Sequence, residues 1–150
     1  MDTRLRALTK KDHGQAMELW ANSVSDSHDF VSEKDFDYYR AVLPKYLLDV
    51  NLYGLVDNNN KLKAFIGVSN DKIELLFVHP KQTRKGYGKF LVNYAINELK
   101  IKKVDVNEQN INALRFYEKM GFKIANRSEL DGEGLPYPIL YLELSSPGRP

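Results

Sequence analysis

A glycine-containing loop between an apolar run and a helical run is the part of the sequence best suited to chemistry. The segment reads PKQTRKGYGKFL and spans residues 80–91. Gly86 and Gly88 let the backbone approach a ligand closely, and free N–H groups at a helix start favour an anionic phosphate. The positively charged side chains beside the glycines are Arg84, Lys85 and Lys89. The loop therefore predicts a binding site for a diphosphate.

Two well-known phosphate loops do not fit this segment. A Walker loop needs a Mg²⁺-binding Ser or Thr after its lysine, whereas Lys89 is followed by Phe90. A dinucleotide-binding loop needs a third glycine at position 91, which is Leu91. The residues of the loop therefore exclude both of these nucleotide sites.

The loop instead resembles the acyl-CoA loop of the GNAT superfamily of N-acetyltransferases, which has the pattern Q/R-x-x-G-x-G/A after a strand ending in Val-x-Pro. Val78 and Pro80 stand at that spacing before the two glycines, whereas Thr83 occupies the Q/R position. We expect this departure to weaken side-chain support for CoA without removing the backbone cradle. Together with Asn110, the acetyl-CoA-binding residues that the resemblance implies are Phe77, Val78, Thr83, Arg84, Lys85, Gly86, Tyr87, Gly88 and Lys89.

A second segment makes the resemblance more specific. Residues 110–122, NINALRFYEKMGF, match the superfamily pattern N-x-x-A-x-x-F-Y-x-x-x-G-F at every position. Asn110 is a good helix N-cap and Gly121 a good helix stop. On the residues alone, Tyr117 is best explained as a core aromatic. The resemblance implies instead that Tyr117 is the general acid that protonates the departing CoA thiolate.

Shorter matches point to one group within the superfamily. Residues 27–30, 106–110 and 136–138 are similar to small stand-alone bacterial proteins of the YjaB type. His28 and Phe30 lie in the loop that walls the acceptor pocket in this superfamily, and Tyr137 lies between two prolines near the end of the chain. The resemblance implies that all three contact the substrate, and structural roles stay open as alternatives.

The reaction also needs a base, because an amine that is protonated at neutral pH has no lone pair for attack on a thioester. Glu74 and Asp105 lie on the two strands that we expect to flank the cofactor. Asp105 precedes Asn110 by five residues, a position at which related enzymes that modify protein N-termini carry a glutamate. An exposed edge carboxylate, with a water chain as the base, is the alternative for each.

Composition excludes several other classes of function. The 150 residues suffice for one core, and a net charge of +2 gives no support for nucleic-acid or membrane binding. The absence of cysteine excludes disulfides, a thiolate zinc site and an acetyl-cysteine intermediate, so any acetyl transfer is direct. The three histidines have no spacing typical of a metal site, and we predict none.

The chain shows no pattern typical of a signal peptide and no apolar run of the roughly 20 residues that a membrane span needs. We therefore expect a cytoplasmic protein, either a monomer or a homodimer, whose partner is a small-molecule or peptide amine. Residues 1–144 are expected to form a single domain, followed by a flexible tail at 145–150.

Hydrophobic periodicity predicts a mixed α/β fold with the order β-α-α-β-β-β-α-β-α-β-β. The superfamily has this order, with a sheet that is splayed between its fourth and fifth strands to hold acyl-CoA. Expected helices cover residues 10–24, 32–46, 86–99 and 112–120, with a break or kink near Pro44. Expected strands cover 3–8, 52–56, 62–69, 73–78, 104–106, 122–126 and 139–144. The resemblance implies an acetyl-CoA-dependent N-acetyltransferase. A non-catalytic acyl-CoA-binding sensor or interaction module is the alternative.

Overall fold

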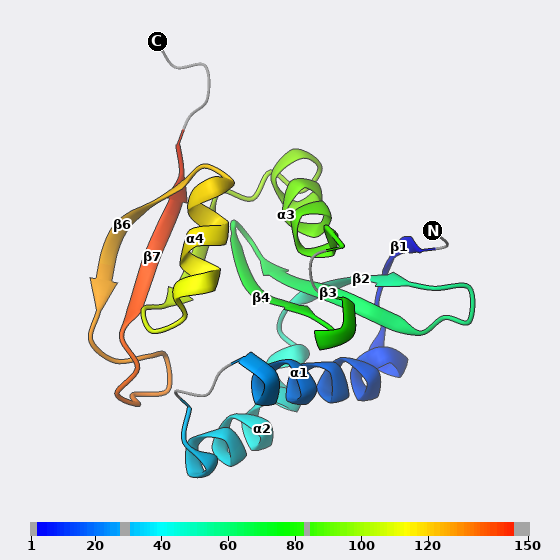
Figure 1. Ribbon diagram of the computed structural model, residues 1–150, viewed down its shortest axis with the longest axis horizontal. Helices are drawn as coiled ribbons and strands as arrows, with labels where there is room; N and C mark the ends of the chain where they lie inside the picture. Colours follow the sequence, from blue (N-terminus) through cyan, green and yellow to red (C-terminus); the bar gives the residue numbers. More distant parts are fainter. Residues whose placement is uncertain (1–2, 28–30, 83–84, 146–150) are drawn as a thin grey trace.

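The computed structural model describes residues 3–27, 31–82 and 85–145, which form a seven-stranded sheet with helices on both faces (Figure 1). The strands are β1 (Arg4–Ala7), β2 (Asn51–Val56), β3 (Leu62–Ser69), β4 (Lys72–Val78), β5 (Lys103–Asn107), β6 (Phe122–Ser128) and β7 (Ile139–Leu144). The helices are η1 (Lys10–Asp12), α1 (His13–Ser27), α2 (Glu33–Leu47), η2 (Pro80–Gln82), α3 (Tyr87–Asn97) and α4 (Ile111–Lys119), where η denotes a 3-10 helix. The mixed α/β class and the order of elements are as predicted.

The sheet divides between β4 and β5. Its strand order is β1-β2-β3-β4-β5-β7-β6, and β4 and β5 are parallel neighbours. Their ladder contains only the pairs Lys72 with Lys103 and Ile73 with Val104, although β4 stays paired with β3 as far as Val78. In Figure 1, β6 and β7 accordingly diverge from β4. The predicted splay between the fourth and fifth strands is therefore confirmed.

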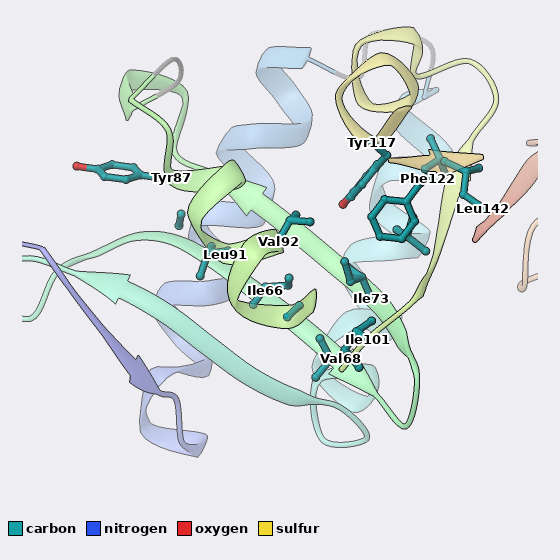
Figure 2. Close-up of a cluster of buried hydrophobic side chains, with 14 of the residues drawn as sticks. Ile66, Val68, Ile73, Tyr87, Leu91, Val92, Ile101, Tyr117, Phe122 and Leu142 are labelled. Carbon is teal, nitrogen blue, oxygen red and sulfur yellow. The ribbon is translucent and has the colours of Figure 1, made fainter. Parts of the chain in front are cut away.

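Two apolar clusters fix the helices to opposite faces of the sheet. On one face, α1 and α2 pack side chains such as Trp20 and Leu47 against Phe65 of β3. On the other face, α3 and α4 pack Leu91 and Tyr117 against strand residues on both sides of the splay (Figure 2). Burying each large apolar side chain contributes roughly 1.5–3 kcal/mol, so the two clusters hold the divided sheet together.

Local sequence sets the ends of the helices. The Thr9 side chain accepts a hydrogen bond from the Lys11 N–H at the start of η1, and the Asn110 side chain accepts one from the Ala113 N–H at the start of α4. Gly121 follows α4 with a φ of +105°, a conformation that favours glycine. The predicted cap at Asn110 and the predicted helix stop at Gly121 are confirmed.

Of the break or kink expected near Pro44, the break is wrong. Helix α2 continues through Pro44 to Leu47. Leu43 and Leu47 are both buried in the apolar cluster between α1, α2 and the sheet, and this packing holds the last turn in place despite the missing proline N–H.

Near the end of the chain, the Ser145 N–H donates to the Gly121 carbonyl at 3.0 Å, and residues 146–150 lie outside the described ranges.

An ion pair fastens the first strand to the start of α1. The Arg6 guanidinium binds both carboxylate oxygens of Asp12 at 2.7 and 3.0 Å, and the Thr9 N–H donates to the same carboxylate at 2.8 Å. These hydrogen bonds from Arg6, aided by Thr9, lower the pKa of Asp12 to about 2, although burial opposes them. Because the folded-state pKa is depressed, the stabilisation is present above pH 4 and is lost as the pH falls towards 2.

We expect Asp12→Asn to lower the free energy of unfolding at pH 7 by roughly 2 kcal/mol, because the depressed pKa stabilises the folded state by about that amount. Urea unfolding at pH 7 and pH 3 measures the effect, which should be clearly smaller at pH 3. Asp71→Asn, which removes an exposed carboxylate 3.4 Å from Lys103, is the control and should have little effect at either pH. An equal loss for Asp12→Asn at both pH values would contradict the linkage.

Candidate active site

The separation of β4 from β5 gathers residues from strands and helices that are far apart in the sequence. Because side chains alternate along a strand, Val104 and Val106 of β5 enter the cluster beneath α3 and α4, and Asp105 faces the side of α1 and α2. Tyr117 lies in the cluster beneath α3 and α4. The two main catalytic candidates therefore lie on opposite faces of the divided sheet.

The predicted diphosphate loop leads directly into α3. Gly86 is the N-cap of α3 in the left-handed conformation, with a φ of +81°, and it provides no side-chain cap. The N–H groups of the first turn thus meet no capping side chain from Gly86, and the helix dipole favours an anion at this end. Lys85 and Lys89 are exposed beside it. Two predicted members of the site, Thr83 and Arg84, lie outside the described residues.

Gly88 joins this loop to the rest of the site. A Cβ atom added at Gly88 would lie 3.6 Å from Cζ of Phe116 and 3.8 Å from Cγ2 of Val78, so the start of α3 lies against both α4 and the end of β4. Tyr87 is buried, and Figure 2 shows its hydroxyl pointing away from the cluster. Phe77, which precedes Val78, packs on Phe65 with the ring centroids 5.8 Å apart. The predicted loop and strand residues that the structure describes are therefore brought together.

Tyr117 is both a core residue and a possible proton donor. Its side chain is 5% exposed and makes edge contacts with Phe116 and Phe122, at centroid distances of 5.1 and 5.7 Å. Burial raises the pKa of the Tyr117 phenol, which keeps its proton at neutral pH. Within the described ranges, no side chain hydrogen bonds to this hydroxyl, which points from α4 towards α3 (Figure 2).

Glu74 lies at an irregularity in β4. Gly67 of β3 is paired with Leu75 and the next residue, Val68, with Ile73, so Glu74 is an extra residue in a β-bulge. One Glu74 carboxylate oxygen accepts from the Tyr46 hydroxyl and the other from the Ser69 hydroxyl, each at 2.6 Å. Burial, together with the hydrogen bond to Glu74, raises the pKa of Tyr46. The sequence indicated Glu74 but gave no sign of these two partners.

Asp105 lies just beyond the last β4–β5 pair. Its Oδ2 atom is 3.0 Å from Nζ of Lys72, and both side chains are about 30% exposed. Burial raises the pKa of Asp105, Lys72 opposes this effect, and the negative charge of Glu74 adds to it. Sequence reasoning missed Lys72. The contact arises from strand register, which the sequence does not show: Lys72 pairs with Lys103, and Asp105 is the next residue on the same face of β5.

Tyr137 fastens the connection between β6 and β7 to α2. Its side chain is buried and its hydroxyl donates to a carboxylate oxygen of Asp35. On the same helix, the Tyr39 hydroxyl donates to Asp131, and the Tyr38 hydroxyl donates to Glu133 at 2.7 Å. Tyr137 is thus engaged by α2 close to the predicted acceptor loop. His28 and Phe30 of that loop lie outside the described residues.

Asn110 acts locally as the cap of α4, since its side-chain oxygen accepts from the Ala113 N–H at 3.1 Å.

Among residues 3–27, 31–82 and 85–145, no three His, Asp or Glu side chains are grouped closely enough to hold a metal ion. The helices in these ranges include none that is both long and apolar enough to cross a membrane.

The comparisons with known proteins agree with this geometry. Residues 34–138 match the sequence model of the acetyltransferase (GNAT) domain, which covers more than half of the chain. The protein therefore belongs to the GNAT family of acetyltransferases. As a member of that family it uses acetyl-CoA to acetylate an amine acceptor.

Individual relatives indicate which group of the GNAT family this chain resembles. The chain is 34% identical to the peptidyl-lysine N-acetyltransferase YjaB of Salmonella typhimurium, over 95% of this chain and 98% of that protein. It is 31% identical to YjaB of Escherichia coli, over 92% and 94%. The solution structure of apo YjaB from Escherichia coli superimposes with a TM-score of 0.88 at 30% identity, covering 97% and 99% of the two chains. The predicted resemblance to YjaB-type proteins is confirmed, and these relatives are named as enzymes.

A more distant neighbour shares the fold. The PaiA N-acetyltransferase of Thermoplasma acidophilum, solved in complex with coenzyme A, superimposes with a TM-score of 0.71 at 22% identity, covering 95% of this chain and 99% of that chain. In the present chain the left-handed Gly86, the uncapped start of α3 and the early end of the β4–β5 ladder fit a diphosphate followed by an extended arm.

Acetyl-CoA should raise the melting temperature of the wild-type protein, because a ligand bound only by the folded state stabilises it. We expect Gly86→Val to abolish this shift, since a branched side chain strains the left-handed backbone and blocks close approach. Differential scanning fluorimetry with and without acetyl-CoA measures both quantities.

Gly134→Val is the matched control. Gly134 has a φ of +79°, and, as at Gly86, an added Cβ would meet nothing within 4 Å. Both variants should lose roughly 1–2 kcal/mol of stability through backbone strain, but only Gly86→Val should lose the acetyl-CoA shift. Equal shifts in the two variants would contradict the assignment of the diphosphate loop.

Proposed function

We propose that this protein acetylates lysine side chains of peptides or proteins. The observation that carries the proposal is the placement of a proton donor, Tyr117, and a carboxylate, Asp105, on opposite faces of the sheet where β4 and β5 separate. Direct transfer needs a base on the side where the amine enters and an acid on the side where the thiolate leaves. The names of the two YjaB relatives support lysine as the acceptor.

Binding the cosubstrate is the task of the loop and of β4. Acetyl-CoA supplies an activated acetyl thioester, which is open to attack by an amine and releases a thiolate. The start of α3 and the side chains of Lys85 and Lys89 bind the diphosphate, with Thr83 and Arg84 completing the loop. The backbone of Phe77 and Val78 lies along the acyl end, where an N–H stabilises developing negative charge.

Asp105 is the better candidate for the base. Both oxygens of Glu74 already accept short hydrogen bonds from Tyr46 and Ser69, which occupy that carboxylate and hold it in place. Asp105 has one oxygen on Lys72, and burial raises its pKa, so it is more basic than an exposed aspartate. Asp105 takes the acceptor's proton, directly or through water.

Tyr117 returns a proton on the other face. Its raised pKa keeps the phenol protonated, and its ring, packed edge-on against Phe122, directs the hydroxyl towards α3. Tyr137 and the loop carrying His28 and Phe30 form the acceptor side, with Tyr137 positioned by Asp35. A cytoplasmic location, where acetyl-CoA is available as cosubstrate, is part of the proposal.

A peptide with one lysine and a blocked N-terminus should be acetylated at that lysine, because the lysine amine is then its only free primary amine. Release of CoA thiol, with mass spectrometry of the peptide, measures this activity. The same peptide with arginine replacing lysine is the substrate control. N-terminal peptides, polyamines and aminoglycosides form the competing acceptor set, and a clear preference for one of these would contradict the proposal.

Tyr117→Phe is the enzyme control for that assay. It keeps the ring and its packing but removes the proton donor, so the acetyl-CoA thermal shift should persist. General-acid contributions of about 10²- to 10⁴-fold set the expected loss of turnover. Unchanged turnover in this variant would leave Tyr117 with a packing role alone.

Asp105→Asn should reduce the rate most near neutral pH, where free amine is scarce, and should recover partly as the pH is raised. The measurement is kcat/KM for the lysine peptide from pH 6 to pH 9, expressed as the ratio of variant to wild type. Glu74→Gln is the matched control on the neighbouring strand and should remain close to wild type. A ratio for Asp105→Asn that stays flat across this range would argue for a positional role or a water relay.

A further inference from the structure

Lys72 is a charged residue of the site to which the proposed reaction assigns no role. Its ammonium lies 3.0 Å from Oδ2 of Asp105 and 5.9 Å from the centroid of the Tyr141 ring, which is paired with Asp105 across β5 and β7. The side chain is about 30% exposed, so this contact is better shielded from solvent than a surface ion pair. Lys72 therefore has a defined position between an aromatic ring and a carboxylate.

The Lys72 side chain is in direct polar contact with Asp105. Among the described residues, Lys72 is the one that donates to the Asp105 carboxylate, through Oδ2. The competing carboxylate, Glu74, is already bound by Tyr46 and Ser69 and is not in ion-pair contact with Lys72. The titratable or charged groups near Asp105 are Lys72 and Glu74 from β4, Tyr46 from α2, Tyr141 from β7 and, on β5 itself, Lys103.

Lys103 is occupied elsewhere, since its ammonium lies 3.4 Å from Asp71 in a more exposed ion pair. Removing Lys72 would thus leave Asp105 half-buried beside the negative charge of Glu74, with no cation in contact among the described residues. The pKa of Asp105, already raised by burial, would rise further, because Lys72 is the group that lowers it. The pKa of Lys72 is correspondingly raised, chiefly by its hydrogen bond to Asp105, so Lys72 remains a cation.

We propose that Lys72 is a positioning residue that keeps the Asp105 carboxylate ionised and directed across the point where β4 and β5 separate, and so sets the lower pH limit of catalysis. This inference rests on the proposed role of Asp105 as base. Lys72 holds Oδ2, which leaves Oδ1 to receive the proton of the acceptor. The residue acts through Asp105 and takes no proton itself.

The test compares Lys72→Met, which keeps the length of the side chain, with Lys72→Arg and with Lys103→Met as the matched control. We measure kcat/KM for the lysine peptide from pH 5 to pH 9 as a ratio to wild type, so that titration of the acceptor amine cancels. For Lys72→Met we expect a loss on the order of tenfold at the acidic end that shrinks towards pH 9. Lys72→Arg should restore most of the rate, and Lys103→Met should follow the wild-type profile.

A double variant separates positioning from general damage. In an Asp105→Asn background, Lys72→Met should cause little further loss, because the group it acts on is gone. A loss of the same size in both backgrounds, or a pH-independent loss with a lowered melting temperature, would overturn the inference and leave Lys72 as a structural contact.

A direct titration of Asp105 tests the role of Lys72 independently of the proposed function. Carboxyl-carbon NMR of the full-length protein follows Asp105 without any substrate. A higher pKa of Asp105 in Lys72→Met than in wild type supports the role of Lys72 even if lysine peptides prove not to be acceptors. An unchanged pKa overturns it, whatever the activity assays give.

Discussion

The early end of the β4–β5 ladder is the constraint on which the rest of this structure depends. Two strands that run parallel would normally pair along their whole length, because buried backbone N–H and C=O groups need partners. Here the pairing stops after Ile73 and Val104 while β4 continues to Val78 beside β3. The fold therefore has to hold two half-sheets at a fixed separation without a shared ladder. Its helices, side-chain pairs and connections serve that purpose.

Each face of the sheet meets this requirement differently. Beneath α3 and α4 the two halves are joined by apolar contact, where Tyr117 and Phe122 pack with residues of both half-sheets. On the opposite face the link is polar, since Lys72 reaches from β4 to Asp105 of β5. The chemistry follows the same division: a phenol with a raised pKa lies in the apolar layer, and a carboxylate paired with Lys72 lies on the other side. Burial raises the pKa of both catalytic candidates, and only Asp105 has a cation beside it that opposes this effect.

Local sequence was sufficient for much of this architecture. The strand and helix order, the cap at Asn110 and the stop at Gly121 follow from short-range rules and were predicted. The contacts that define the chemistry were not. Lys72 meets Asp105 through strand register, and Glu74 meets Tyr46 and Ser69 only because a bulge turns it out of alternation. No spacing within the sequence encodes a bulge or the packing of α2, and the same packing carries the helix through Pro44.

The tyrosines that join α2 to the connection between β6 and β7 have a consequence for behaviour in salt. Tyr38, Tyr39 and Tyr137 each donate a neutral hydroxyl to a carboxylate, so these links do not depend on attraction between two full charges. Added ions screen exposed charge pairs over a Debye length of about 8 Å at physiological ionic strength, but they weaken such hydroxyl bonds far less. The exposed Lys85 and Lys89 at the start of α3 have no comparable protection. Ionic strength can thus weaken the hold on an anionic ligand while the connection between β6 and β7 stays fixed to α2.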